Sequence, residues 1–150
     1  VKQYRRQADA TATHLVRPLP VLCRTVAHLW TILDRPCTWL QAYNFLLDRT
    51  RAVRQDLQLQ HDPTNCPYLR TSIDLYQQIA RFHVLAGWRT PHAVGAGSEA
   101  EVRALAREAP FDAALNRHHL NNCLITLLDL YGRVRRGPSP DPTPLAHEAE

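Results

Sequence analysis

The sequence contains no methionine, and its first residue is Val1. Because translation normally starts at methionine, we expect the chain to be a piece of a longer protein. The 150 residues are enough for one domain with its own hydrophobic core. Apolar residues make up 45% of the chain, a fraction that excludes wholesale disorder.

Long hydrophobic runs are also absent from the sequence. The longest apolar stretch, from Leu124 to Leu130, is interrupted by Thr126 and Asp129, whereas a membrane-spanning helix needs roughly 18 apolar residues. The start of the chain is basic and is not followed by the apolar core of a signal peptide. We therefore expect a soluble, intracellular chain without membrane insertion.

The common catalytic and cofactor-binding motifs are missing, among them the glycine-rich phosphate loop, HExxH and GxSxG. His119 and Cys123 are four residues apart and would share one face of a helix, but two ligands are too few for a metal site. His83 lies in an apolar stripe, which favours a hydrogen-bonded core histidine over a catalyst. We predict no enzyme activity, no catalytic residue, no metal site and no cofactor.

A strong excess of one charge is not present either. The formal net charge is +4, and the isoelectric point is about 9.1. A mildly basic chain permits contact with RNA or acidic partners without requiring it. Arg5, Arg6 and Arg24 are the candidates for nucleic-acid contact, and Arg51 and Arg54 would extend this set.

Hydrophobic periodicity predicts five helices and no strand. Apolar residues recur at three- and four-residue spacing in residues 20–34, 39–60, 67–88, 98–108 and 111–135. Thr38 and Gln41 form a capping box at the start of the second helix, and Gly137 ends the last helix. On the last helix we expect these side chains to face inward: Leu115, Leu120, Cys123, Leu124, Leu127, Leu128, Tyr131 and Val134.

The order of the helices favours an all-α fold of antiparallel helix pairs stacked on one another. The third helix carries two apolar stripes, which predicts that it is contacted from two sides and lies centrally. We assign residues 1–136 to this helical domain. Residues 137–150 are rich in proline, and we expect a flexible tail or linker there.

The second helix carries five charged residues close together, Asp48, Arg49, Arg51, Arg54 and Asp56. At about 100° per residue, Asp48 and Arg51 should point to solvent, while Arg49 and Asp56 should share one flank of the apolar stripe. Arg54 falls inside the stripe, where an unpaired charge would be costly. Two interpretations stay open: ion pairs that hold helices together, or contacts to a partner protein or a phosphate group.

This helix resembles the signature of the GANP / Sac-three family. That signature reads Phe-Leu-x-Asp-Arg-x-Arg, then alanine, an aliphatic residue, arginine, any residue and aspartate, and residues 45–56 follow it. Four other segments agree with the family in the same order, residues 1–6, 16–25, 79–83 and 121–131. Together these segments cover most of residues 1–136.

The resemblance implies a TPR-like helical superhelix that leads into a winged helix, as in PCI domains, with the winged-helix half missing from these 150 residues. It also implies partners of the full-length chain: a PCI-domain protein, a small acidic proteasome-lid-type subunit and a centrin-like protein, with RNA as a further ligand. The implied location is the nucleus, at the nuclear pore or envelope, with the cytoplasm and the centrosome as further locations.

We therefore expect a scaffold domain of a nuclear mRNA export factor, of the kind that organises the TREX-two transcription–export complex. A centrosomal, spindle-associated, splicing-linked or elongation-linked relative of the same family is one alternative, because the chain contains the domain that these branches share. Direct RNA or DNA binding by a helical module is the alternative of another class.

Overall fold

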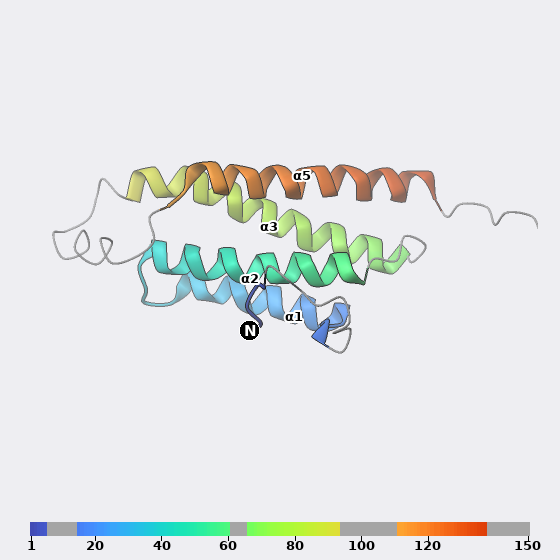
Figure 1. The fold of residues 1–150 in the computed structure, drawn as a ribbon, viewed down its shortest axis with the longest axis horizontal. Coiled ribbons are helices and arrows are strands. Elements are labelled where there is room, and N and C mark those ends of the chain that lie inside the picture. The colour runs from blue at the N-terminus through green and yellow to red at the C-terminus, as the bar shows by residue number, and fades with distance from the viewer. Residues whose placement is uncertain (6–14, 61–65, 94–110, 138–150) are drawn as a thin grey trace, which may run out of the picture.

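The computed structural model describes residues 1–5, 15–60, 66–93 and 111–137, and Figure 1 shows them as a stack of long helices. The elements are α1 (Leu19–Trp30), the 3-10 helix η2 (Thr31–Asp34), α2 (Trp39–Leu59), α3 (Cys66–Ala93) and α5 (Ala113–Arg136). The described ranges contain no strand, so the predicted all-α fold is confirmed for them. Helices α2 and α3 lie between α1 and α5.

The start of α2 follows the predicted capping box. The Thr38 hydroxyl accepts a hydrogen bond from the Gln41 backbone N–H, and the Thr38 N–H donates to the Gln41 side chain, both at 3.2 Å. Before it, the chain tightens into η2 and becomes extended at Arg35, because a residue that precedes a proline is driven out of the helical region. The second helix therefore begins where the sequence places it.

Helix α3 is longer than predicted. We expected it to end near Trp88, with a loop from residue 89, whereas the helix continues to Ala93. The expectation relied on Pro91, but a proline close to the end of a helix removes only one of the last hydrogen bonds. The Arg89 guanidinium also lies over the Trp39 ring, 4.7 Å from its centre, and holds this part of α3 against α2.

Several predictions lie outside the described residues. These are the helix at 98–108, the turn at 61–65 and the proline-rich tail after Gly137. The last described helix, α5, begins two residues later than predicted, and the Asp112 side chain caps it by accepting a hydrogen bond from the Leu115 N–H at 2.9 Å.

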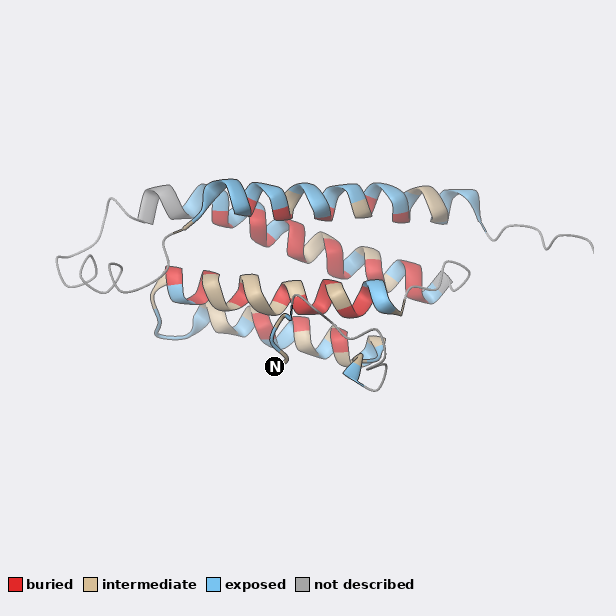
Figure 2. Cartoon of the chain, in the orientation of Figure 1, coloured by how far each residue is buried: buried red, intermediate tan, exposed pale blue. Residues whose placement is uncertain are grey.

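The hydrophobic core follows both faces of α3, which confirms the predicted central position of that helix (Figure 2). The Phe82 ring lies 5.8 Å from that of Tyr43 on α2 and 5.9 Å from that of Trp30 on α1. The apolar residues of the core without any exposed surface are Leu22, Val26, Leu29, Leu46, Ala52, Val53, Ile79, Ala86 and Cys123.

The predicted inner face of α5 is wrong for five of its eight residues, which are exposed: Leu115, Leu124, Leu128, Tyr131 and Val134. The helix has apolar residues on more than one side, but it packs mainly against α3 and can bury only one stripe. That stripe consists of Asn116, His119, Cys123, Leu127 and Leu130. Figure 2 shows most of α5 as exposed.

Candidate functional site

The charged residues of α2 point to two different parts of the molecule. Asp48, Arg51 and Asp56 contact the first residues of the chain or the segment before α1, whereas Arg54 points toward α5. These side chains lie within little more than two turns of the helix, so that one short stretch of sequence makes both sets of contacts.

Asp56 is completely buried and has two cationic partners. Its carboxylate lies 2.7 Å from Lys2 Nζ and 2.6 Å from Arg17 Nε, and it also accepts a hydrogen bond from the Arg17 backbone N–H at 3.3 Å. Gln60, one turn later, donates to the Arg17 carbonyl at 2.9 Å. These contacts attach the N-terminal residues and the entry to α1 onto α2.

Helix α2 also carries the charged residues Asp48, Arg49 and Arg51. Asp48 is paired with its neighbour Arg49 at 2.7 Å and accepts the Tyr4 backbone N–H at 3.3 Å. The Arg49 guanidinium lies 4.8 Å from the centre of the Phe45 ring, and that of Arg51 lies 4.0 Å from the centre of the Tyr4 ring. Arg51 is half-buried because Tyr4 covers it.

Arg54 is buried and reaches across to α5. Its Nη2 atom lies 3.1 Å from His119 Nδ1, and its Nη1 donates to the Cys123 sulfur at 3.6 Å. The four-residue spacing of His119 and Cys123 predicts that they share one face of a helix, and in the structure both face the Arg54 guanidinium. Among the described residues no carboxylate lies within ion-pair distance of Arg54.

A second group of buried polar residues adjoins this one and joins α2, α3 and α5. The Asn116 amide oxygen accepts hydrogen bonds from His83 Nδ1 at 2.8 Å and from the Tyr43 hydroxyl at 3.4 Å, and its amide nitrogen donates to the His83 carbonyl at 2.9 Å. The His83 and His119 rings are stacked 5.8 Å apart. His83 is therefore a buried, hydrogen-bonded histidine, as its position in the apolar stripe predicts.

Burial keeps both histidines neutral. It lowers the pKa of His83 to about 4, with a smaller contribution from the charge of Arg54. Burial also lowers the pKa of His119 to about 3, and the charges of Arg54 and Arg51 act in the same direction. The pKa of the Cys123 thiol is raised by burial, so that this side chain is neutral too.

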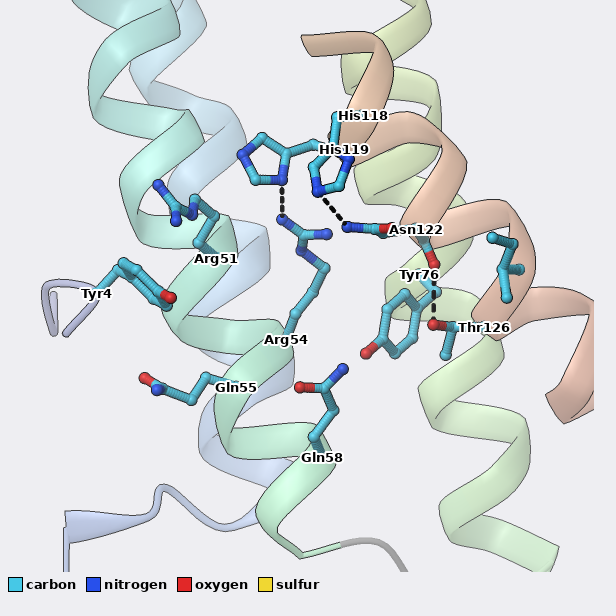
Figure 3. Close-up of a pocket in the computed structure, with 11 residues that line it drawn as sticks. Tyr4, Arg51, Arg54, Gln55, Gln58, Tyr76, His118, His119, Asn122 and Thr126 are labelled. Carbon is cyan, nitrogen blue, oxygen red and sulfur yellow. Dashed lines mark hydrogen bonds between the residues drawn. The ribbon is translucent and has the colours of Figure 1, made fainter. Parts of the chain in front are cut away.

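An open cavity of about 440 Å³ lies between α2, α3 and α5, with Arg54 and His119 among its lining residues (Figure 3). Arg51 and Tyr4 also line it, and Asn122 on α5 adds an amide. The eleven lining residues include two arginines and two histidines but no carboxylate. The cavity is therefore basic.

Of the remaining candidates for nucleic-acid contact, Arg5 and Arg24 are not among the lining residues of this cavity. Arg24 is exposed on α1, and Arg5 is exposed near the N-terminus, where its carbonyl accepts a hydrogen bond from the Gln55 side chain at 3.0 Å. Arg6 is outside the described residues. The structure does not bring Arg5 and Arg24 together with Arg54 in one cavity.

A groove between α3 and α5 is the second notable surface, and we call it the α3–α5 groove. Its volume is about 470 Å³, and it is lined by Ala80, Arg81, Val84, Leu85, Trp88, Leu120 and Leu124. Val84 and Trp88 are 59% and 63% exposed. Large exposed apolar surfaces of this kind mark sites of protein interaction.

In the described part of the chain, three or more histidine, cysteine or acidic side chains nowhere converge as metal ligands would. The helices of that part also include none with the length and apolar character that a membrane crossing requires.

The fold and these surfaces define an all-helical domain with an apolar groove and a basic cavity. Comparison with known sequences specifies its class further. The profile of the SAC3/GANP family matches residues 1–150, and SAC3 family protein B of Arabidopsis thaliana is 35% identical over 138 residues, which is 91% of this chain. The chain therefore belongs to the SAC3/GANP family. It spans 7% of the length of that relative, and no solved structure matches it.

Proposed function

We propose that this chain is a protein-interaction scaffold of a nuclear mRNA export factor, of the type that organises the TREX-two complex at the nuclear pore. The observation that carries the proposal is the family match over residues 1–150. The family signature lies on α2, where Asp48 and Asp56 join this helix to the start of the chain. The proposed partners of the full-length protein are a PCI-domain protein, a small acidic proteasome-lid-type subunit and a centrin-like protein.

The α3–α5 groove supports an interaction function. Of its lining residues, Leu124 is 45% exposed on α5, and Val84 and Trp88 are exposed on α3. In stacked helical proteins each pair of helices buries its free face against a neighbour. We propose that a helix of the PCI-domain partner covers this surface, because an apolar groove between two helices accepts the apolar face of a third.

Affinity purification of the tagged full-length protein, with mass spectrometry of the co-purified chains, tests the proposal. We expect the PCI-domain protein, the small acidic subunit and the centrin-like protein to be recovered together. Recovery of splicing, elongation or spindle-pole proteins in their place would contradict the export function and leave the family assignment unchanged.

A pair of variants connects the purification to the groove. Leu124→Asp places a charge in the groove and should reduce recovery of the PCI-domain protein at least about tenfold, because burying an unpaired charge is costly. Asp74→Lys, at an exposed position of α3 that does not line the groove, is the control and should leave recovery unchanged. Equal recovery with both variants would refute the proposed interface.

A further inference from the structure

The charge of Arg54 lacks a counter-ion within the described residues. Its side chain is 9% exposed, and its two contacts are to His119 and Cys123, which are both neutral. Asp56, two residues later on the same helix, is completely buried but is paired with Lys2 and Arg17. A buried charge without compensation is unfavourable, and an anion that enters from outside would compensate this one.

Two buried N–H groups near this charge lack a hydrogen-bond acceptor. A guanidinium can only donate, so His119 Nδ1 accepts from Arg54, and the proton of the neutral ring lies on Nε2. Neither that Nε2–H nor the Nε–H of Arg54 has an acceptor in the described part of the chain. Both residues line the basic cavity, so an anion bound there would lie close to these unsatisfied donors, although the two donor atoms themselves are enclosed by protein.

The other lining residues of the cavity indicate which chemical groups the ligand has besides its negative charge. The half-buried Tyr4 and the exposed His118 contribute aromatic rings to the lining, and Gln55, Gln58 and Asn122 contribute amides that can both donate and accept (Figure 3). Aromatic rings stack on nucleobases, and amides bond to their edges. The volume of about 440 Å³ also lies within the range of small-molecule sites and exceeds the space that a lone inorganic phosphate needs.

We propose that this cavity binds a nucleotide, whose phosphate group accepts hydrogen bonds from Arg54 and Arg51 and whose base lies against the rings and amides at the rim. The nucleotide is either free or part of a single-stranded RNA, since both present the same phosphate and base. The inference goes beyond the scaffold function, because it concerns a different surface from the α3–α5 groove.

Calorimetric titration of the full-length protein with uridine monophosphate, uridine and inorganic phosphate at constant ionic strength tests the proposal. We expect uridine monophosphate to bind at least about tenfold tighter than uridine, because the phosphate adds charge-assisted hydrogen bonds. Arg54→Gln should weaken uridine monophosphate about tenfold or more, and Arg24→Gln, at an exposed position outside the cavity, should leave its affinity unchanged.

A rim variant keeps the test valid if Arg54→Gln fails to fold. His118 and Asn122 are exposed and hydrogen-bonded to each other at 3.1 Å, so that the double change His118→Ala, Asn122→Ala leaves the core intact. We expect it to weaken uridine monophosphate severalfold while inorganic phosphate binds as before. Equal affinities for uridine and uridine monophosphate would overturn the proposal, and so would an equal loss in Arg24→Gln and Arg54→Gln.

A short oligouridine distinguishes the two sources of the nucleotide. Tighter binding of the oligomer than of the monophosphate, lost in Arg54→Gln, assigns the site to RNA, whereas equal affinities assign it to a free nucleotide. A glutamate-rich peptide is the competing anion. If it bound in an Arg54-dependent manner and uridine monophosphate did not, the nucleotide would be excluded in favour of an acidic protein segment.

Discussion

Replacement of Asp56 by asparagine tests whether buried ion pairs hold the first residues of the chain onto α2. The carboxylate has no exposed surface, while the Lys2 and Arg17 side chains that bind it are 30% and 14% exposed. Asparagine has nearly the same shape and keeps one acceptor, so that the substitution removes the charge with little change in packing. Both cations then lose their counter-ion.

The expected cost follows from the burial of the three groups. Removing one partner of a fully buried ion pair costs about 3–5 kcal/mol. Lys2 and Arg17 are partly exposed and recover some hydration, which places the loss here at about 2–4 kcal/mol. For a chain of this length, each kcal/mol lowers the melting temperature by about 2–4 °C. We therefore expect a decrease of roughly 4–16 °C.

Asp48 provides the matched control on the same helix. Its side chain is 40% exposed, and its ion pair is with the adjacent Arg49, so Asp48→Asn should cost less than about 1 kcal/mol. The assay is chemical denaturation of the purified chain followed by circular dichroism, with the double variant of Lys2→Gln and Asp56→Asn to isolate the pairwise interaction. An Asp56→Asn midpoint equal to that of the parent or of Asp48→Asn would refute the reasoning.

Three further predictions concern stability. Arg54→Ala should cost about 1–3 kcal/mol, because it leaves the His119 acceptor unsatisfied, while Arg54→Met, which fills the space without an uncompensated charge, should cost less in the same denaturation assay. The folded pKa values of His83 and His119 lie below the usual 6.5, so the unfolded chain binds more protons than the folded chain. The free energy of unfolding should therefore fall by up to about 1.4 kcal/mol per pH unit per histidine as the pH drops from about 6.5 toward 4. The variant His118→Gln should retain this slope. Thr38→Ala removes the cap of α2 and should lower the free energy of unfolding by about 0.5–2 kcal/mol.

The helices of the core could be predicted from the sequence because their signals are local. The stripe of apolar residues on each helix reports burial directly, and the capping box at Thr38 is complete within four residues. The end of α3 was predicted wrongly, because the local signals there differ from what a distant contact favours. Thr90 and Pro91 are local signals for a loop, whereas the contact between Arg89 and Trp39 joins residues 50 positions apart in the chain and is not visible in either segment alone.

The buried face of α5 could not be predicted, because it depends on how many neighbours the helix has. Leu124 and Leu128 form as good an apolar stripe as Cys123 and Leu127 do, and periodicity treats the two alike. In the structure the buried stripe is the one that carries Asn116, since this residue forms hydrogen bonds with Nδ1 and the carbonyl of His83 on α3. The role of Asn116 was missed, and its only sequence signal is the spacing of three and seven residues from His119 and Cys123.

The position of Arg54 in the site could be predicted from the sequence, but its contacts could not. The helical period placed Arg54 inside the apolar stripe, but the identity of its contacts depends on residues 65 and 69 positions away. Asp56 lies two positions further, about 200° around the helix, and faces Lys2 and Arg17. Two buried charges of opposite sign thus occupy one turn of α2, and only the acidic one is neutralised within the described residues. Structural ion pairing accounts for Asp56 but not for Arg54, and this difference is the reason to look for an external anion at Arg54 and nowhere else along the helix.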